Sequence, residues 1–365
     1  MCAFSPWPAL FALCVTGLAA TPQPAAAETR TYYIAADETS WNYAPGGTDR
    51  ITGKPLPPPR RDQLGWTYRK AVYNEYTDAS FARVKPKPAY FGILGPVIRA
   101  DVGDNVVVYF KNRTHFPQSV HAHGVRYDKA SEGAPYQSGV AANANDGNSV
   151  RPGGKFRYAW AVPERAGPDH MDVSSVLWMY HSHVDEAAGI SAGLIGPIVI
   201  SRKGGTRADG LPNDVDREIF ALFALEDENQ SPYMRENIAR IPDALRIKPQ
   251  DLQNPFSFFY LSNEIPSING FVFGTMPMPA MRQGERVRWY LLGNASDALD
   301  YHSVHWHGNV ATVVGMRSDV VPLLPGAMAI ADMVPDNPGV WLFHCHVGFH
   351  LAGGMVARYR VLPPA

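Results

Sequence analysis

The chain has 365 residues, a formal net charge of −1 at pH 7, and a hydrophobic content of 45%. A net charge this close to zero gives no indication of a nucleic-acid or anionic-membrane partner. The length allows two ordinary domains with real cores, and the 32 glycines and 32 prolines predict many short strands joined by turns.

Residues 1–27 carry no charged side chain and contain an apolar run from Ala9 to Ala20. Pro- and Ala-rich residues follow and end at Ala27, which predicts an export signal cleaved near that residue, although no Lys or Arg precedes the run. The run is too short for a membrane span, and no later segment reaches about 18 uninterrupted apolar residues. We therefore expect a periplasmic or secreted protein without a membrane span.

The rest of the chain is predicted to be all-β. Short runs that alternate apolar and polar residues fill 28–203, residues 204–215 have the composition of a linker, and similar runs fill 216–365. Within the second half, 231–248 has apolar residues at helical spacing and predicts a short helical insertion. Pro242 makes one continuous helix there unfavourable.

The two halves repeat each other. Ser-Val-His-Ala-His-Gly at 119–124 corresponds to Ser-Val-His-Trp-His-Gly at 303–308, and Tyr-His-Ser-His at 180–183 corresponds to Phe-His-Cys-His at 343–346. This predicts a duplicated module of about 150 residues, in the usual size range for a β-sandwich.

Eight of the twelve histidines lie in four His-X-His pairs. On a strand, both members of such a pair face the same side. Eight imidazoles are too many for one tetrahedral zinc ion and suit a cluster of several copper ions. The pairs are His121 and His123, His181 and His183, His305 and His307, and His344 and His346.

A second set of ligands surrounds Cys345, which faces away from its neighbours on a strand. The other two cysteines lie in the predicted leader, so Cys345 would be the only thiol of the mature protein, and metal ligation explains a free exported thiol. With His350, Met355 and His302, whose odd spacing from His305 places it on the opposite face, Cys345 supplies the donors of a blue-copper site.

The first half lacks these ligands at the matching positions, so a blue-copper site is predicted only in the second half. The residues found there are Gln118, Ser182, Ala187 and Leu194.

These motifs resemble those of the multicopper oxidases. The arrangement of two domains is similar to that of the two-domain small laccases. The residues of the motifs His123-Gly-Val-Arg-Tyr and Tyr180-His-Ser-His are closer to those of ceruloplasmin and the coagulation-factor A domains. The resemblance implies two tandem cupredoxin-like Greek-key domains and four coppers in each functional unit. It assigns type 1 copper to His302, Cys345, His350 and Met355, type 2 copper to His121 and His305, and the type 3 pair to His123, His181, His183, His307, His344 and His346.

The same resemblance implies an oxidase that takes single electrons from a donor and reduces dioxygen to water. A laccase-like phenol or aromatic amine is the first expected donor. A metal-ion oxidase is the alternative, with Asp297 and Asp300 ahead of His302 for ferrous iron, or a methionine segment for cuprous ion; loop packing is favoured for those methionines. The methionines are Met276, Met278 and Met281. A copper-binding or electron-transfer protein is the non-enzymatic alternative.

Oxygen reduction consumes protons, so an acid near the cluster is expected. Asp128, Asp185 and Glu186 follow ligand motifs closely and are candidates. Since each half supplies four imidazoles, the two-domain resemblance implies a head-to-tail homotrimer with clusters between subunits; pairing within one chain stays open.

Overall fold

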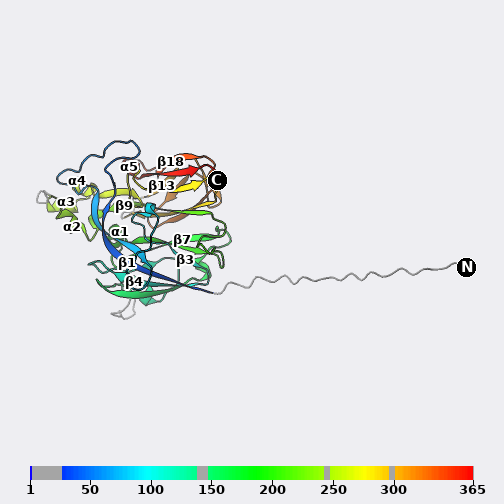
Figure 1. Ribbon diagram of the computed structural model, residues 1–365. Helices are drawn as coiled ribbons and strands as arrows, with labels where there is room; N and C mark the ends of the chain where they lie inside the picture. The colour runs from blue at the N-terminus through cyan, green and yellow to red at the C-terminus, as the bar shows by residue number, and fades with distance from the viewer. Residues whose placement is uncertain (2–26, 138–146, 242–246, 296–300, 365) are drawn as a thin grey trace.

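The computed structural model describes Met1 and residues 27–137, 147–241, 247–295 and 301–364. Nearly all of the predicted leader lies outside these ranges. Two β-sandwiches form the body of the molecule, with the first, blue to green, below the second, yellow to red (Figure 1).

The first sandwich has two four-stranded sheets. One sheet has the order β2 (Thr67–Tyr76), β1 (Thr29–Asn42), β4 (Asn105–Asn112), β6 (Lys155–Ala161). The other has the order β3 (Ile98–Asp101), β8 (Ile195–Ser201), β7 (Ser175–His181), β5 (His121–Ala122). Alternate residues of β4, Val106, Val108 and Phe110, point into the core between the sheets.

The second sandwich repeats this plan. One sheet has the order β10 (Glu264–Ile268), β9 (Arg217–Asp227), β12 (Val287–Ala295), β17 (Met328–Met333), β14 (Ala311–Val313), β15 (Met316–Ser318). The other has the order β11 (Ala280–Arg282), β19 (Val356–Leu362), β18 (Gly339–Cys345), β13 (His302–Trp306), β16 (Val320–Leu323). The parallel pairs β1–β4 and β3–β8 of the first sandwich have counterparts in β9–β12 and β11–β19. The predicted all-β class with two tandem sandwiches is confirmed.

A third apolar layer joins the two sandwiches. Leu177 and Met179 of β7 meet Phe220 of β9 and Tyr290 of β12 there. Because β8 and β9 are covered on both faces, all seven residues of β8 and the last nine of β9 are buried.

The division along the sequence is not the division in packing. Trp41, at the end of β1, donates from Nε1 to the carbonyl of Gly270 in the second half at 2.6 Å. Tyr43 and Tyr68 pack with Val272 in one small core. The segment after β1 therefore belongs to the surface of the second sandwich as much as to the first.

The helices are short. They are α1 (Glu186–Ala192), α2 (Met234–Ile238), α3 (Pro249–Gln253), α4 (Phe258–Leu261), α5 (Gly348–Ala352) and the 3-10 turns η1 (Ala89–Phe91), η2 (Lys129–Ser131), η3 (Glu164–Ala166) and η4 (Glu228–Gln230). In the described ranges, none is long and apolar enough to cross a membrane.

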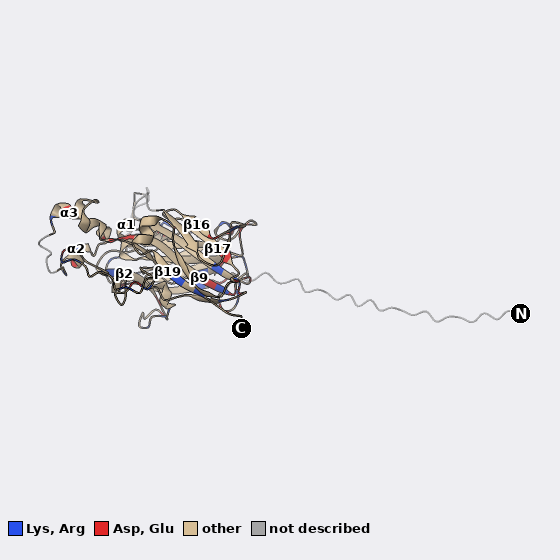
Figure 2. Cartoon of the chain, turned by 90° about the horizontal axis from the view of Figure 1, so that it is seen from above, with Lys and Arg blue, Asp and Glu red and all other residues tan. Residues whose placement is uncertain are grey.

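The predicted helical insertion is confirmed in part. α2 lies inside 231–248, whereas residues 242–246, with Pro242, lie outside the described residues. α3 and α4 extend the insertion beyond its predicted end, and Ser257 begins α4 by accepting a hydrogen bond from the Tyr260 amide at 3.0 Å. Figure 2 shows α2 and α3 at one end of the molecule, outside the sheets.

A buried ion cluster also joins the sandwiches. The Lys70 ammonium on β2 contacts the Glu228 carboxylate, lies 3.5 Å from Glu226, and donates to the carbonyl of Ser191 in α1 at 2.8 Å. All three charged side chains are buried. The pKa of Glu226 is raised to about 7, mainly by burial. Attraction to Lys70 lowers this pKa, and repulsion from Glu228 raises it further.

We predict that Glu226→Gln changes the pH dependence of stability. A raised folded-state pKa stabilises the protein fully below about pH 4.5, and this contribution is lost as pH rises through about 7. Glutamine stays neutral at every pH. From pH 5 to pH 8 the free energy of unfolding of the variant should therefore rise by about 1–3 kcal/mol relative to that of wild type. Urea denaturation at both pH values measures this. An equal change for the exposed control Glu164→Gln would contradict the prediction.

Candidate metal centres

The pairing of β13 with β18 separates two groups of side chains. Val304 lies opposite Cys345, and His305 lies opposite His344. Along β13, His302 and Val304 are buried, whereas His305 is only half-buried. Cys345 and His302 therefore face the core of the second sandwich, and the histidine pairs lie on the opposite face, as the alternation predicts. On that face His344 is buried and His346 is exposed.

The inner group consists of His302, Cys345 and His350. Their possible ligand atoms all lie within 4.8 Å of one another, and all three side chains are buried. Cys345 Sγ lies 3.5 Å from His350 Nδ1. His302 Nε2 lies 3.2 Å from the carbonyl of Asn294, while its Nδ1 is buried without a hydrogen-bond partner. A buried nitrogen in that position is satisfied by a bound metal ion.

The sulfur of Cys345 has a defined environment. The backbone amides of Ser303 and Val347 donate to Sγ at 3.3 and 3.4 Å. Burial raises the pKa of the Cys345 thiol, and these two amides oppose the rise. Amide donors and a bound cation both favour the thiolate form that a soft metal requires.

The remaining donors suit copper. Burial lowers the pKa of His302, and it lowers that of His350 to about 4, so both imidazoles are neutral near pH 7. Met355 is fully buried in the same core, and its carbonyl accepts from the Cys345 amide at 3.1 Å. A thiolate, two imidazoles and a nearby thioether form a donor set that fits copper of the blue type.

The first outer set comes from β5 and β7 and the residues that follow them. His121 lies opposite His181, and the Nε2 atoms of His123 and His181 are 3.1 Å apart. The contacting rings of this set have centroids 5.0–5.5 Å apart. Burial lowers the pKa of His123 to about 4 and that of His181 to about 3. These neutral, converging nitrogens can bind metal ions.

The second outer set has the same geometry. The Nε2 atoms of His307 and His344 are 3.0 Å apart, and contacting rings have centroids 4.9–5.3 Å apart. His344 Nδ1 lies 2.9 Å from the carbonyl of Cys345, which connects this set to the inner group. His305 Nδ1 lies 2.9 Å from the carbonyl of Asp319, which orients the ring and leaves Nε2 for a metal.

A glycine follows the first His-X-His pair in both halves. Gly124 and Gly308 have φ values of +79° and +74°. A Cβ at either residue would lie 2.4 Å from the ring of Trp178 or Trp341, respectively. Only glycine allows the chain to turn against the tryptophan here, so this residue fixes where the histidine strand ends.

The two outer sets do not meet within the described chain. Ring contacts join histidines inside each set, and no ring contact joins a described histidine of one set to the other. His346 is exposed, His183 is half-buried, and an open depression of about 440 Å³ lies beside His305 and His307. Each set is therefore one half of a possible centre and opens toward the outside.

The first half fills the place of the inner group with polar hydrogen bonds. Ser182 Oγ accepts from the Ser119 amide at 3.2 Å, as Cys345 Sγ accepts from the Ser303 amide. The same hydroxyl donates to Gln118 Oε1 at 2.7 Å. The Ser182 hydroxyl and the Gln118 side-chain oxygen are thus hydrogen-bonded to each other, and neither is free to bind a metal ion.

The prediction that Ala187 corresponds to His350 was wrong. Leu194 donates from its amide to the carbonyl of Gly189 at 3.1 Å, as Met355 does to His350 at 2.9 Å, so Gly189 and not Ala187 is the equivalent residue. α1 has seven residues where α5 has five, which shifts the register by two. A Cβ on Gly189 would lie 2.9 Å from Ser182, so the helix backbone closes the space of the imidazole.

The three predicted acids have different surroundings. Asp128 caps η2 by accepting from the Ser131 amide at 2.8 Å, and Asp185 caps α1 by accepting from the Ala188 amide at 3.2 Å. Glu186 instead points at imidazoles. Its carboxylate oxygens lie 3.4 Å from His183 Nε2 and 3.8 Å from His181 Nε2.

The residues proposed for a metal-ion donor are only partly described. Asp297 and Asp300 lie outside the described residues. Met276 and Met281 are buried in the core of the second sandwich, and Met278 is half-buried. The two core methionines pack there and do not form a surface site for a soft ion.

Some contributors had little or no sequence signal. The carbonyl of Glu132, 2.7 Å from His121 Nδ1, orients that ring, and a backbone carbonyl has no side-chain identity to detect. Ser119 and Ser303 do occupy the same place in the repeated motif, and that repetition could have identified the amide that binds Cys345.

Together these features define a two-sandwich protein with one buried group of thiol and imidazole ligands and two outer sets of imidazoles, whose donors fit copper. Two family models, each described as multicopper oxidase, match residues 91–205 and 244–365. The chain belongs to the multicopper oxidase family.

The curated relatives agree with this family. The chain is 40% identical over 345 residues to ferroxidase HEPHL1 of Mus musculus, covering 92% of this chain and 29% of that protein. It is 38% identical to hephaestin of Homo sapiens, covering 93% of this chain and 30% of that protein. It is also 38% identical to ceruloplasmin of Rattus norvegicus, covering 91% of this chain and 32% of that protein. The chain thus spans about a third of the length of these relatives.

Solved structures agree on the fold. One described as a multicopper oxidase superposes with a TM-score of 0.58 at 21% identity, covering 92% of this chain and 89% of that one. A blue copper oxidase from Nitrosomonas europaea gives 0.59 at 18% identity, with 92% and 86% covered. Both sandwiches are therefore cupredoxin-like, as the resemblance implied.

We predict that Ser182→Cys does not create a second blue-copper site. Gly189 closes the place of the imidazole, and Leu194 replaces the thioether, so the new thiol gains no partner ligands. Visible absorption and copper content per chain should equal those of wild type. A second blue band, beyond that of the wild-type protein, would show that the first sandwich is more adaptable than its packing indicates.

Proposed function

We propose that this protein oxidises a metal ion, ferrous iron first, and couples the oxidation to the reduction of dioxygen to water. One observation carries the oxidase: Cys345 lies in the buried group while the histidines on either side of it lie in the outer set. The donor is supported by the similarity to ferroxidase HEPHL1, beside that to hephaestin and ceruloplasmin, which favours the metal-ion alternative over the laccase-like expectation. The apolar leader supports an exported location.

The ligand assignments are those that the family resemblance implies, and the grouping of the side chains supports them. The inner group with Met355 would hold type 1 copper, His121 and His305 a type 2 copper, and the other six outer histidines a type 3 pair. Copper held in this way supplies one-electron oxidation at the first site and dioxygen reduction at the second.

The protein itself provides the connection and the proton. Cys345 is covalently continuous with His344 and His346, and its carbonyl is 2.9 Å from His344 Nδ1, so the two groups are joined by a short bonded path. Of the three predicted acids, Glu186 is the one that contacts ligand imidazoles, and we assign it the role of holding a proton beside them. Asp128 and Asp185 serve as caps.

Each outer set is open and incomplete, which supports assembly through head-to-tail contacts. In a closed ring, the first sandwich of one chain would face the second sandwich of the next and complete the eight imidazoles. A homotrimer, the expectation from the two-domain family, would carry three such centres.

An aromatic donor is the second candidate. Tyr301 and Phe349 are exposed, and they stand directly beside His302 and His350 in sequence. Exposed rings next to the ligands of the inner group would suit a phenol.

We predict faster oxygen uptake with ferrous iron than with a phenol for the copper-loaded protein. Measurement with an oxygen electrode, with spontaneous iron oxidation subtracted, compares the donors directly. Cys345→Ser removes the thiolate and should abolish uptake with both donors. Faster oxygen uptake with the phenol would show that the donor is aromatic and not a metal ion. If the protein were blue but consumed no oxygen with either donor, only a copper-binding role would remain.

We predict that two inactive variants restore each other when they are co-expressed. His181→Ala damages the first outer set and His344→Ala the second, so a chain of each kind can still supply one intact half. Centres between chains would recover a substantial part of the wild-type activity, and sedimentation would give the mass of three chains. No recovery from a mixed oligomer would indicate that each centre forms within one chain.

A further inference from the structure

The insertion that carries α3 and α4 presents a group of exposed apolar side chains. Leu252 is 36% exposed, Phe256 85%, Phe258 57% and Leu261 49%. We call these four residues the apolar tip. Large apolar side chains grouped on the surface in this way mark a contact with another molecule or with lipid.

The tip is held rigidly outward. Between its members, Phe259 is buried, and the Tyr260 hydroxyl donates to Asp227 at 3.2 Å. Asn229 donates to the carbonyl of Tyr260 at 3.0 Å, and the Ser257 hydroxyl donates to the carbonyl of Asp251 at 2.6 Å. The bonds of Tyr260 anchor the inner side of the segment to the end of β9 and to η4, and the bond of Ser257 holds α4 against α3. The outer side stays exposed.

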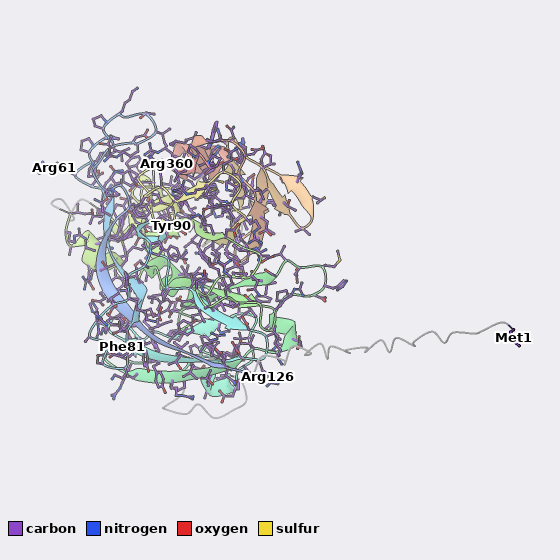
Figure 3. The ribbon with its side chains drawn as sticks, turned by 45° about the vertical axis from the view of Figure 1, so that its right-hand side comes forward. Met1, Arg61, Phe81, Tyr90, Arg126 and Arg360 are labelled. Atoms are coloured by element: carbon purple, nitrogen blue, oxygen red, sulfur yellow. The ribbon has the colours of Figure 1, made fainter. Side chains whose placement is uncertain are left out.

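Charge is absent from the tip and present at its base. Residues 252–263 contain no Asp, Glu, Lys or Arg. The Arg60 guanidinium lies 4.6 Å from the Phe258 ring and is paired with the Asp62 carboxylate at 2.8 Å, with 61% of its side chain exposed. Lys248 is exposed just before α3. The neighbouring Arg61 lies at the edge of the molecule (Figure 3).

We infer that the apolar tip inserts into the interfacial layer of a phospholipid membrane, with Lys248 and the Arg60–Asp62 ion pair at the level of the headgroups. An uncharged group of exposed phenylalanine and leucine side chains with charged groups at its base matches the order of layers in a bilayer surface. Since the net charge of the chain is near zero, the attachment depends on this local surface and not on general electrostatic attraction.

Vesicle flotation tests the inference with the full protein. Wild type should float with vesicles of phosphatidylcholine containing about a third phosphatidylglycerol, and Phe256→Ser/Phe258→Ser should lower the partition coefficient about tenfold or more. Met171→Ser is the matched control, because Met171 is 83% exposed on the first sandwich, and it should bind as wild type does. Arg60→Gln should weaken binding to these vesicles more than to pure phosphatidylcholine.

Two results would overturn the inference. Wild type that stays free of all vesicles has no membrane site, and equal flotation of the double variant places the site elsewhere. If wild type stays free and light scattering shows a smaller assembly for the double variant, the tip is an interface between copies. Oxygen uptake should be unchanged in the double variant, since the tip contains no proposed ligand, so failure here leaves the proposed oxidase intact.

Discussion

The register between β13 and β18 is the constraint on which the metal chemistry depends. With Val304 opposite Cys345 and His305 opposite His344, one face of the strand pair buries a thiolate and the other presents imidazoles. A slip of one residue would exchange the two faces, placing the thiol in water and charged or metal-binding rings in the core. The core around Trp289, Trp306 and Phe343 fixes this register through its size and shape.

Duplication supplied the same scaffold twice, and a few substitutions gave the copies different chemistry. The outer histidines remain in both copies with the same spacing and the same glycine turn. The inner site is replaced in the first copy by a hydrogen bond between Ser182 and Gln118, and Gly189 lets α1 close over it. The buried Lys70 cluster then holds the C-terminal end of the same helix against the second copy, so α1 contacts both sandwiches.

Much of this architecture follows from the sequence because strand alternation and repetition are local signals. The histidine pairs, Cys345 and the absence of an inner site in the first half needed only spacing. The match of His350 with Ala187 failed because the extra residues of α1 change its length without changing the motif. The contact of Trp41 with Gly270 and the ion cluster of Lys70 join residues far apart in the chain, and no spacing rule predicts such pairs. The identity of the proposed electron donor could not be predicted in the same way, because Asp297 and Asp300, the acids ahead of His302, lie outside the described structure.

The open outer sets also have a consequence for how the protein matures. Four imidazoles on one surface can bind a metal ion weakly, and the same ion held by two facing surfaces is bound far more strongly. In the proposed head-to-tail assembly, metal loading and subunit association would be linked equilibria, in which each raises the affinity of the other. Under this linkage, copper supply would control how many chains are assembled, and dilution would release metal before any chain unfolds.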